Sequence, residues 1–100
     1  MTKRYSKIEA LRIIQRILKN GEIAFTAHSE DRMIERRFDM QDFFYVLKKG
    51  KIIKEPEIHL KTGHWIYRVE GKTLDDKTLK ISVDIEEEEN RINILTGFGL

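Results

Sequence analysis

The 100-residue chain contains no cysteine and a single proline, Pro56. Without cysteine, neither a disulfide nor a thiolate metal site can stabilise the fold, and catalysis by a cysteine nucleophile is excluded. The sequence also lacks a G-x-S-x-G elbow and a glycine-rich phosphate loop. Acid–base and electrostatic chemistry therefore remain as the catalytic possibilities.

Long apolar runs are absent as well. Residues 1–10 lack the apolar segment of a signal peptide, and no stretch approaches the roughly 20 apolar residues that a membrane span needs. No internal repeat or Gly/Ser-rich linker divides the chain, and its length suits one domain. We therefore expect a single soluble domain over residues 1–100, located in the cytoplasm and without membrane contact.

Positive charge is scarce in the last fifth of the chain. Residues 81–100 carry one arginine against five acidic side chains, a balance of −4, whereas residues 1–80 carry 18 Lys/Arg against 12 Asp/Glu, a balance of +6. The basic part favours an anionic partner, and it is equally typical of a well-solvated surface.

Two segments begin with the pattern of a helix capping box. These are Ser6 with Glu9 and Asp39 with Asp42. The first predicts a helix over residues 7–20, and the second predicts a helix that ends at Gly50. The apolar side chains expected to face the core from the first helix are Ile8, Leu11, Ile14 and Leu18, with Ile13 and Ile17 beside them.

A further helix is expected between these two. Thr26 is a suitable N-cap for a helix over about residues 27–36. Ala27 and Ile34 are expected to face the interior from this helix.

Strands are predicted where apolar and polar side chains alternate. Pro56 cannot donate to a ladder, so the strand that contains Ile52 and Ile58 is expected at an edge of the sheet. The expected strands cover about residues 23–25, 52–58, 65–70, 79–85 and 91–96.

The order of these elements predicts an α+β domain. An N-terminal helix is followed by a short strand, two helices and an antiparallel sheet of about four strands. Short connections between the later strands favour a meander, with the helices packed on one face of the sheet. The opposite face would show Arg68, Lys80, Ser82 and Asn93.

The densest group of ionisable side chains lies on the predicted helix over residues 27–36. His28, Arg32, Glu35 and Arg36 fall on one side of it, because positions three and four apart are neighbours on a helix. Cleavage of RNA by its own 2′-hydroxyl needs a base, an acid and positive charge near the phosphorus, and this group can supply all three. Alternatively, His28 and Arg32 form surface ion pairs that have no further role.

The three histidines do not have the spacing of a metal site. Arg32 is a poor ligand beside His28, and His59 and His64 lie in or beside a loop without ligand spacing. The acidic residues 86–89 lack the ligand alternation and the glycine of a calcium loop. We therefore expect neither a metal nor another cofactor.

The segment FTAHSEDRMIERRFD, residues 25–39, resembles a family signature. The signature is F-[ST]-x-H-x-x-x-R-M-x-x-R-G-[IF]-[ST], and it is typical of small, largely uncharacterised bacterial domains. FFYVLKKGKII and INILTGF continue the resemblance, which covers about residues 23–98. That family resembles the RelE/BrnT-like toxins of type II toxin–antitoxin systems, whose studied members include messenger-RNA endoribonucleases, ribosome-dependent or free, that are inhibited by an antitoxin.

The resemblance implies a toxin-like core over residues 22–100, preceded by an extra helix over residues 1–21. It implies RNA or the ribosome as substrate and an antitoxin as protein partner. It implies that His28, Arg32 and Arg36 match the polar positions of the family, with Arg68 added from the sheet. Glu35 joins the predicted catalytic group from its spacing on the helix.

Two positions depart from the family pattern, and the departures leave a second function open. Arg37 replaces the glycine of the signature, and Phe98 stands where many relatives have tyrosine. The alternative to a ribonuclease is a non-catalytic protein- or RNA-interaction module of the same fold.

Overall fold

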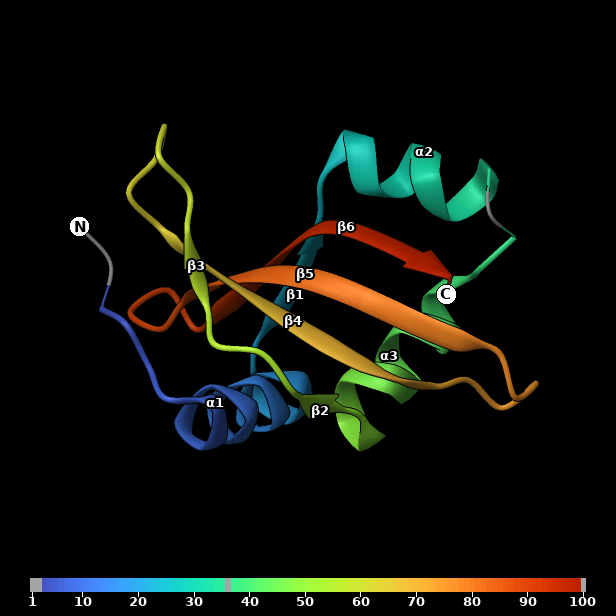
Figure 1. The fold of residues 1–100 in the computed structure, drawn as a ribbon, viewed down its shortest axis with the longest axis horizontal. Helices are drawn as coiled ribbons and strands as arrows, with labels where there is room; N and C mark the ends of the chain where they lie inside the picture. Colours follow the sequence, from blue (N-terminus) through green and yellow to red (C-terminus); the bar gives the residue numbers. More distant parts are fainter. Residues whose placement is uncertain (1–2, 36, 100) are drawn as a thin grey trace.

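Helices and strands follow the order expected from the sequence. The computed structural model describes residues 3–35 and 37–99, and for residues 32–35 and 97–99 it describes the backbone alone. The helices are α1 (Lys7–Asn20), α2 (Ala27–Glu35) and α3 (Met40–Lys49), as Figure 1 shows. The strands are β1 (Glu22–Phe25), β2 (Lys51–Ile52), β3 (Glu57–Ile58), β4 (Trp65–Lys72), β5 (Thr78–Glu86) and β6 (Arg91–Gly99). The α+β class is confirmed.

Both predicted capping boxes are formed. At α1, the Glu9 N–H donates to Ser6 Oγ at 3.1 Å, and the Ser6 N–H donates to Glu9 Oε1 at 3.2 Å. At α3, the Asp42 N–H donates to Asp39 Oδ1 at 2.9 Å, and the Asp39 N–H donates to Asp42 Oδ2 at 3.0 Å. These bonds satisfy N–H groups that have no partner within the helix, so local sequence alone defines where α1 and α3 begin.

The sheet is mixed rather than wholly antiparallel. Its strand order is β1-β6-β5-β4-β2, and β3 also pairs with β4. The expected antiparallel meander is formed by β4, β5 and β6, whereas β1 pairs parallel to β6. A parallel pair needs a long crossover, and α2, α3 and the meander provide it. The single strand expected over residues 52–58 is two short strands, with Pro56 between them.

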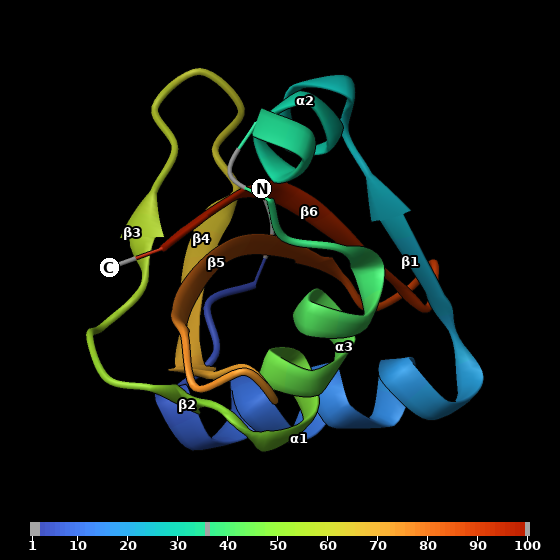
Figure 2. The same cartoon turned by 90° about the vertical axis from the view of Figure 1, so that its right-hand side faces the viewer.

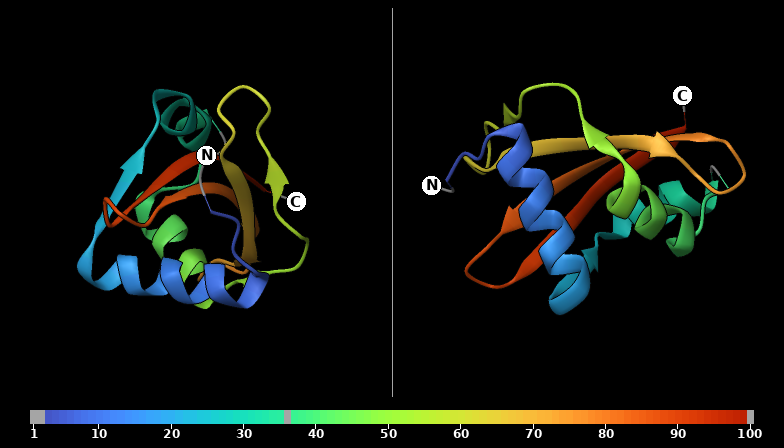
Figure 3. Two further views of the ribbon diagram at one scale, coloured as in Figure 1. Left: turned by 90° about the vertical axis from the view of Figure 1, so that its left-hand side faces the viewer. Right: turned by 90° about the horizontal axis from the view of Figure 1, so that it is seen from below.

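Helices lie on both faces of the sheet, which corrects the expectation of one-sided packing. In Figure 2, β6, β5 and β4 arch over α3 and α1, and α2 lies outside the arch beside β6. The left view of Figure 3 shows the same arrangement from the opposite end. We call the face covered by α1 and α3 the inner face and the opposite face the outer face.

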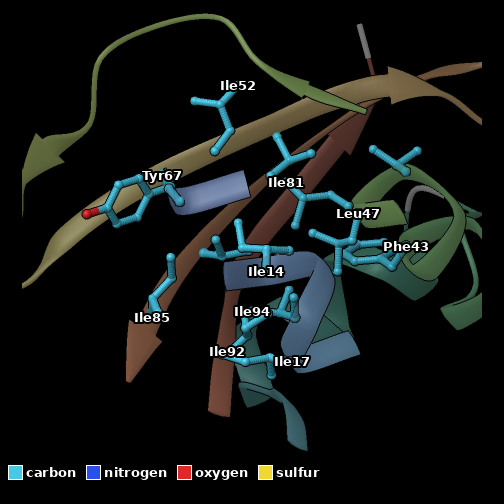
Figure 4. Close-up of a cluster of buried hydrophobic side chains, with 14 of the residues drawn as sticks. Ile14, Ile17, Phe43, Leu47, Ile52, Tyr67, Ile81, Ile85, Ile92 and Ile94 are labelled. Atoms are coloured by element: carbon cyan, nitrogen blue, oxygen red, sulfur yellow. The ribbon is translucent and has the colours of Figure 1, made fainter. Parts of the chain in front are cut away.

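The core fills the inner face. Alternate side chains of the three long strands are buried there, and Figure 4 shows several of them together with Ile14, Ile17, Phe43 and Leu47 of the helices. The buried apolar residues of these three strands are Tyr67, Val69, Leu79, Ile81, Val83, Ile85, Ile92 and Ile94. None of the described helices has the length and apolar character needed to cross a membrane.

Two predictions of inward-facing residues are wrong. Ile8 is 67% exposed, because the buried side of α1 is centred on Ile14 and Ile17 and a position six residues earlier is turned by about 120° around the helix. In α2, Ala27 is exposed and Ser29 is buried instead. Ser29 donates from its N–H to Thr26 Oγ1 at 3.1 Å, so Thr26 does cap this helix as expected.

The orientation of α1 can be tested with two substitutions of the same type. Ile14→Ala is expected to lower the free energy of unfolding by about 2–5 kcal/mol, because it leaves a cavity at a fully buried position. Ile8→Ala in the same helix should change it by no more than about 0.5 kcal/mol. Urea denaturation followed by circular dichroism measures both values, and an equal loss for the two variants would contradict the observed orientation.

Candidate functional site

A cavity of about 390 Å³ opens on the outer face of the sheet. Its floor comes from the outward-facing residues of β4, β5 and β6, and one wall comes from residues 59–64. Arg68 lies opposite Ser82, and Ser82 lies opposite Thr96, in the register of the three strands. The lining residues are His59, Thr62, His64, Ile66, Arg68, Ser82, Asp84, Leu95 and Thr96.

A β-bulge shapes the floor of this cavity. The register between β5 and β6 shifts between Ser82 and Val83, so that Ser82 pairs with Thr96 while Val83 pairs with Ile94. Leu95 is the extra residue of the bulge, and both Leu95 and Thr96 line the cavity.

Two imidazoles face the cavity from neighbouring segments. The His59 N–H donates to the His64 carbonyl oxygen at 2.8 Å, which continues the antiparallel register of β3 and β4 by one pair. Directly opposed residues of an antiparallel pair have Cβ atoms about 4.5–5.5 Å apart. His59 and His64 therefore form a cross-strand pair of imidazole side chains.

A buried carboxylate holds one of these rings. His64 Nδ1 lies 2.9 Å from Asp84 Oδ2, and Asp84 is only 7% exposed. An ionised carboxylate can only accept, so Nδ1 carries the hydrogen and the neutral ring keeps its free lone pair on Nε2. Asn93 also donates to Asp84 Oδ2, at 3.3 Å. This arrangement fixes the orientation and the tautomer of His64.

Arg68 brings positive charge to the same cavity. Its Nη1 lies 3.4 Å from Glu57 Oε1, whose side chain is 64% exposed. An ion pair with such an exposed partner is weak, so an anionic ligand can replace Glu57 at the guanidinium. The planar guanidinium can bind two phosphate oxygens at once.

The other side of His64 is acidic. His64 also borders a second cavity of about 440 Å³, which is lined by residues 85–89 together with Lys3 and Tyr5. Hydrogen bonds from Asn93 and Arg91 hold the pKa of Glu86 below its ordinary value. Glu86 therefore stays ionised at this border, and an anion is expected to approach His64 from the side of Arg68.

Tyr5 anchors the N-terminal segment at the acidic cavity. Its hydroxyl donates to Glu87 Oε1 at 2.5 Å, and its N–H donates to the Tyr67 hydroxyl at 2.8 Å. Burial and the bond to Glu87 raise the pKa of Tyr5 to about 12. The phenol is therefore a neutral donor that fixes Glu87, and it is not a general base near neutral pH.

The predicted site residues fall in two places. Arg68 lies in the outer-face cavity, as its strand position indicated. His28 is exposed on the first turn of α2 and is not among the described residues that line this cavity. Arg32 and Glu35 belong to α2, but their side chains and the whole of Arg36 lie outside the described part of the chain.

Sequence reasoning missed His59, His64 and Asp84 as members of one site. The alternation that places Arg68 on the outer face also places His64 there when it is extended back past Ile66. The hairpin around residues 73–77 pairs Ile66 with Asp84, which makes His64 and Asp84 diagonal neighbours. The register of β4 and β5, extended back to His64, could therefore have predicted that His64 and Asp84 lie together.

No metal site accompanies these residues in the described part of the chain, where no three His, Asp or Glu side chains converge to hold an ion.

Arg37, the position where the family signature has glycine, has a φ of 61°. This is the left-handed region that favours glycine, so the turn before α3 keeps the conformation that glycine would provide.

Comparison with known proteins gives a family but no individual relative. The family model of a domain of unknown function matches residues 25–96. No curated protein and no solved structure matches the chain. The matched segment contains every lining residue of the outer-face cavity, and α1 precedes it.

The hydrogen bond from Asn93 to Glu86 can be tested by titration. Asn93→Ala is expected to raise the pKa of Glu86 toward its ordinary value, because the largest cause of its lowered pKa is removed. A lowered pKa in the folded state stabilises the fold above the ordinary pKa and loses that effect as the pH falls. The variant should therefore lose less stability on acidification.

Carboxyl ¹³C chemical shifts followed by NMR measure the pKa of Glu86 directly. Asn20→Ala is the matched control, because Asn20 contributes only its backbone carbonyl, to Asn90. An unchanged titration of Glu86 in Asn93→Ala would contradict the assigned cause.

Proposed function

Because the chain belongs to the DUF4258 family, a domain family without an assigned activity, we propose its function from the outer-face cavity: metal-independent endoribonuclease activity of the RelE/BrnT-like kind. One observation carries this proposal. His64 is held at 2.9 Å by the buried Asp84, in a cavity that also contains His59 and Arg68.

The residues of the cavity match the needs of RNA cleavage. Attack of the 2′-hydroxyl on the adjacent phosphorus requires a base, an acid and positive charge, and no protein nucleophile. The two histidines provide the base and the acid, and Arg68 provides the charge. The volume of about 390 Å³ lies at the lower end of small-ligand sites, which suits one nucleotide with its phosphate.

The hydrogen bond of His64 to Asp84 supports the following proton transfers. Nε2 of His64 takes the proton of the 2′-hydroxyl while the 2′-oxygen bonds to phosphorus. The bond from phosphorus to the 5′-oxygen breaks, and that oxygen takes a proton from His59. The products are a 2′,3′-cyclic phosphate and a 5′-hydroxyl. Asp84 acts through His64 as a positioning residue, and Arg68 balances the charge on the phosphate.

The group on α2 has a separate part in this proposal. His28, Arg32 and Arg36 extend the RNA-binding surface beyond the cavity through phosphate contacts. A RelE/BrnT-like toxin also implies an antitoxin as protein partner, encoded beside it. The ribosome is the second candidate substrate, because some toxins of this kind cleave only ribosome-bound messenger RNA.

Substitutions in the cavity test the chemistry. His64→Ala and His59→Ala are each expected to slow cleavage by about 10²- to 10⁴-fold, because each removes one proton-transfer group. End-labelled RNA incubated with the protein, with and without ribosomes, gives the rates. Lys77→Ala, at an exposed loop position, is the matched control and should keep wild-type activity.

A substrate with a single 2′-deoxynucleotide at the cleavage position should remain intact, because the attacking hydroxyl is missing. The ribonuclease proposal fails if wild-type protein neither cleaves RNA nor arrests growth, alone or with ribosomes. A stable RNA or protein complex that forms equally with His64→Ala, without cleavage, would support the non-catalytic interaction module instead.

A second comparison separates the cavity from α2 as the place of proton transfer. His28→Ala and Arg32→Ala are expected to weaken RNA binding and to leave the maximal rate within about tenfold of wild type, as for residues that only bind phosphate. Single-turnover cleavage at saturating protein measures that rate. A loss of more than a hundredfold in His28→Ala, together with an active His64→Ala, would move the chemistry to α2.

A further inference from the structure

A second candidate site lies on the solvent side of the inner-face helices, away from the outer-face cavity. A cavity of about 420 Å³ is lined by residues of both α1 and α3. The right view of Figure 3 shows these two helices on the same side of the molecule. The lining residues are Gln15, Leu18, Lys19, Phe44, Lys48 and Lys49, and we call this site the α1–α3 groove.

The groove has an apolar floor that packing against the core leaves partly exposed. Phe44 is 40% exposed, and Leu18 is only half-buried against the core. Met40, one turn before Phe44 on α3, is 46% exposed, and Ile8 at the start of α1 is 67% exposed. The apolar surface of these helices is therefore wider than the buried core requires, which is typical of a binding surface.

The rim of the groove is basic. Lys19 comes from α1, and Lys48 and Lys49 come from the last turn of α3. None of the three forms an ion pair with a described residue, and no described acidic side chain lines the groove. Gln15 Nε2 donates to the Lys48 carbonyl oxygen at 3.3 Å and ties the two helices together.

We propose that the α1–α3 groove binds an acidic amphipathic helix of a partner protein. Apolar side chains of that helix pack on Leu18 and Phe44, while its carboxylates pair with the three lysines. The apolar floor favours a peptide over RNA, because Leu18 offers nothing to a sugar–phosphate backbone. This site is separate from the proposed RNA-cleaving cavity, so either can exist without the other.

A designed peptide probes this chemistry. It carries leucines at helical spacing and glutamates on both flanks, and a second peptide has lysine in place of every glutamate. Titration into ¹⁵N-labelled full-length protein should shift the amide signals of Gln15, Leu18 and Phe44 with the acidic peptide alone. A labelled uridine oligoribonucleotide, tested in the same way, should leave these signals unchanged.

Charge reversal of Lys19, Lys48 and Lys49 to glutamate should weaken binding of the acidic peptide by about tenfold or more. The matched control reverses three exposed lysines elsewhere, at Lys54, Lys61 and Lys77, and should bind as the wild type does. The proposal is overturned if the acidic peptide shifts no groove signal, if both triple variants bind equally, or if the oligoribonucleotide moves the groove signals and the peptide does not.

Discussion

The register between β4 and β5 is the constraint on which both faces of the sheet depend. Tyr67 pairs with Val83 on the inner face, and Arg68 pairs with Ser82 on the outer face. A slip of β4 by one residue along β5 would turn Arg68 into the core and expose Tyr67. The apolar side chains therefore determine the register, and the register in turn determines which polar side chains meet in the cavity.

Local signals in the sequence predicted the local features of the fold. The two capping boxes define the starts of α1 and α3, because the residues that form them are three positions apart. Features that depend on distant segments were not predictable in this way. The parallel place of β1, the position of α2 on the outer face and the rotation of α1 that exposes Ile8 all depend on packing between remote parts of the chain.

The candidate site shows the same division. Strand alternation placed Arg68 on the outer face correctly, because it needs only neighbouring residues. It did not reveal that Ser82 and Asp84 are buried, since the segment that lines the cavity over them, residues 59–64, belongs to a different part of the chain. In the sequence, His59 and His64 resemble isolated loop histidines. Their cross-strand pairing and the contact of His64 with Asp84 appear only in the fold. The cluster on α2 is a prediction from helix spacing and family resemblance, and Arg68 alone links that prediction to the cavity.

The bulge at Leu95 determines which chemical group closes the floor of the cavity. Ile92 and Ile94 point inward, so an uninterrupted strand would also direct Thr96 into the core, among isoleucine and valine side chains. One extra residue reverses the alternation, and Thr96 instead stands opposite Ser82 on the outer face. The same sequence paired without the bulge would place Leu95 opposite Ser82 and would bury the Thr96 hydroxyl away from the cavity. The bulge thus reverses which side chains of β6 face the core. As a result, one strand supplies apolar packing at one end and a polar binding surface at the other.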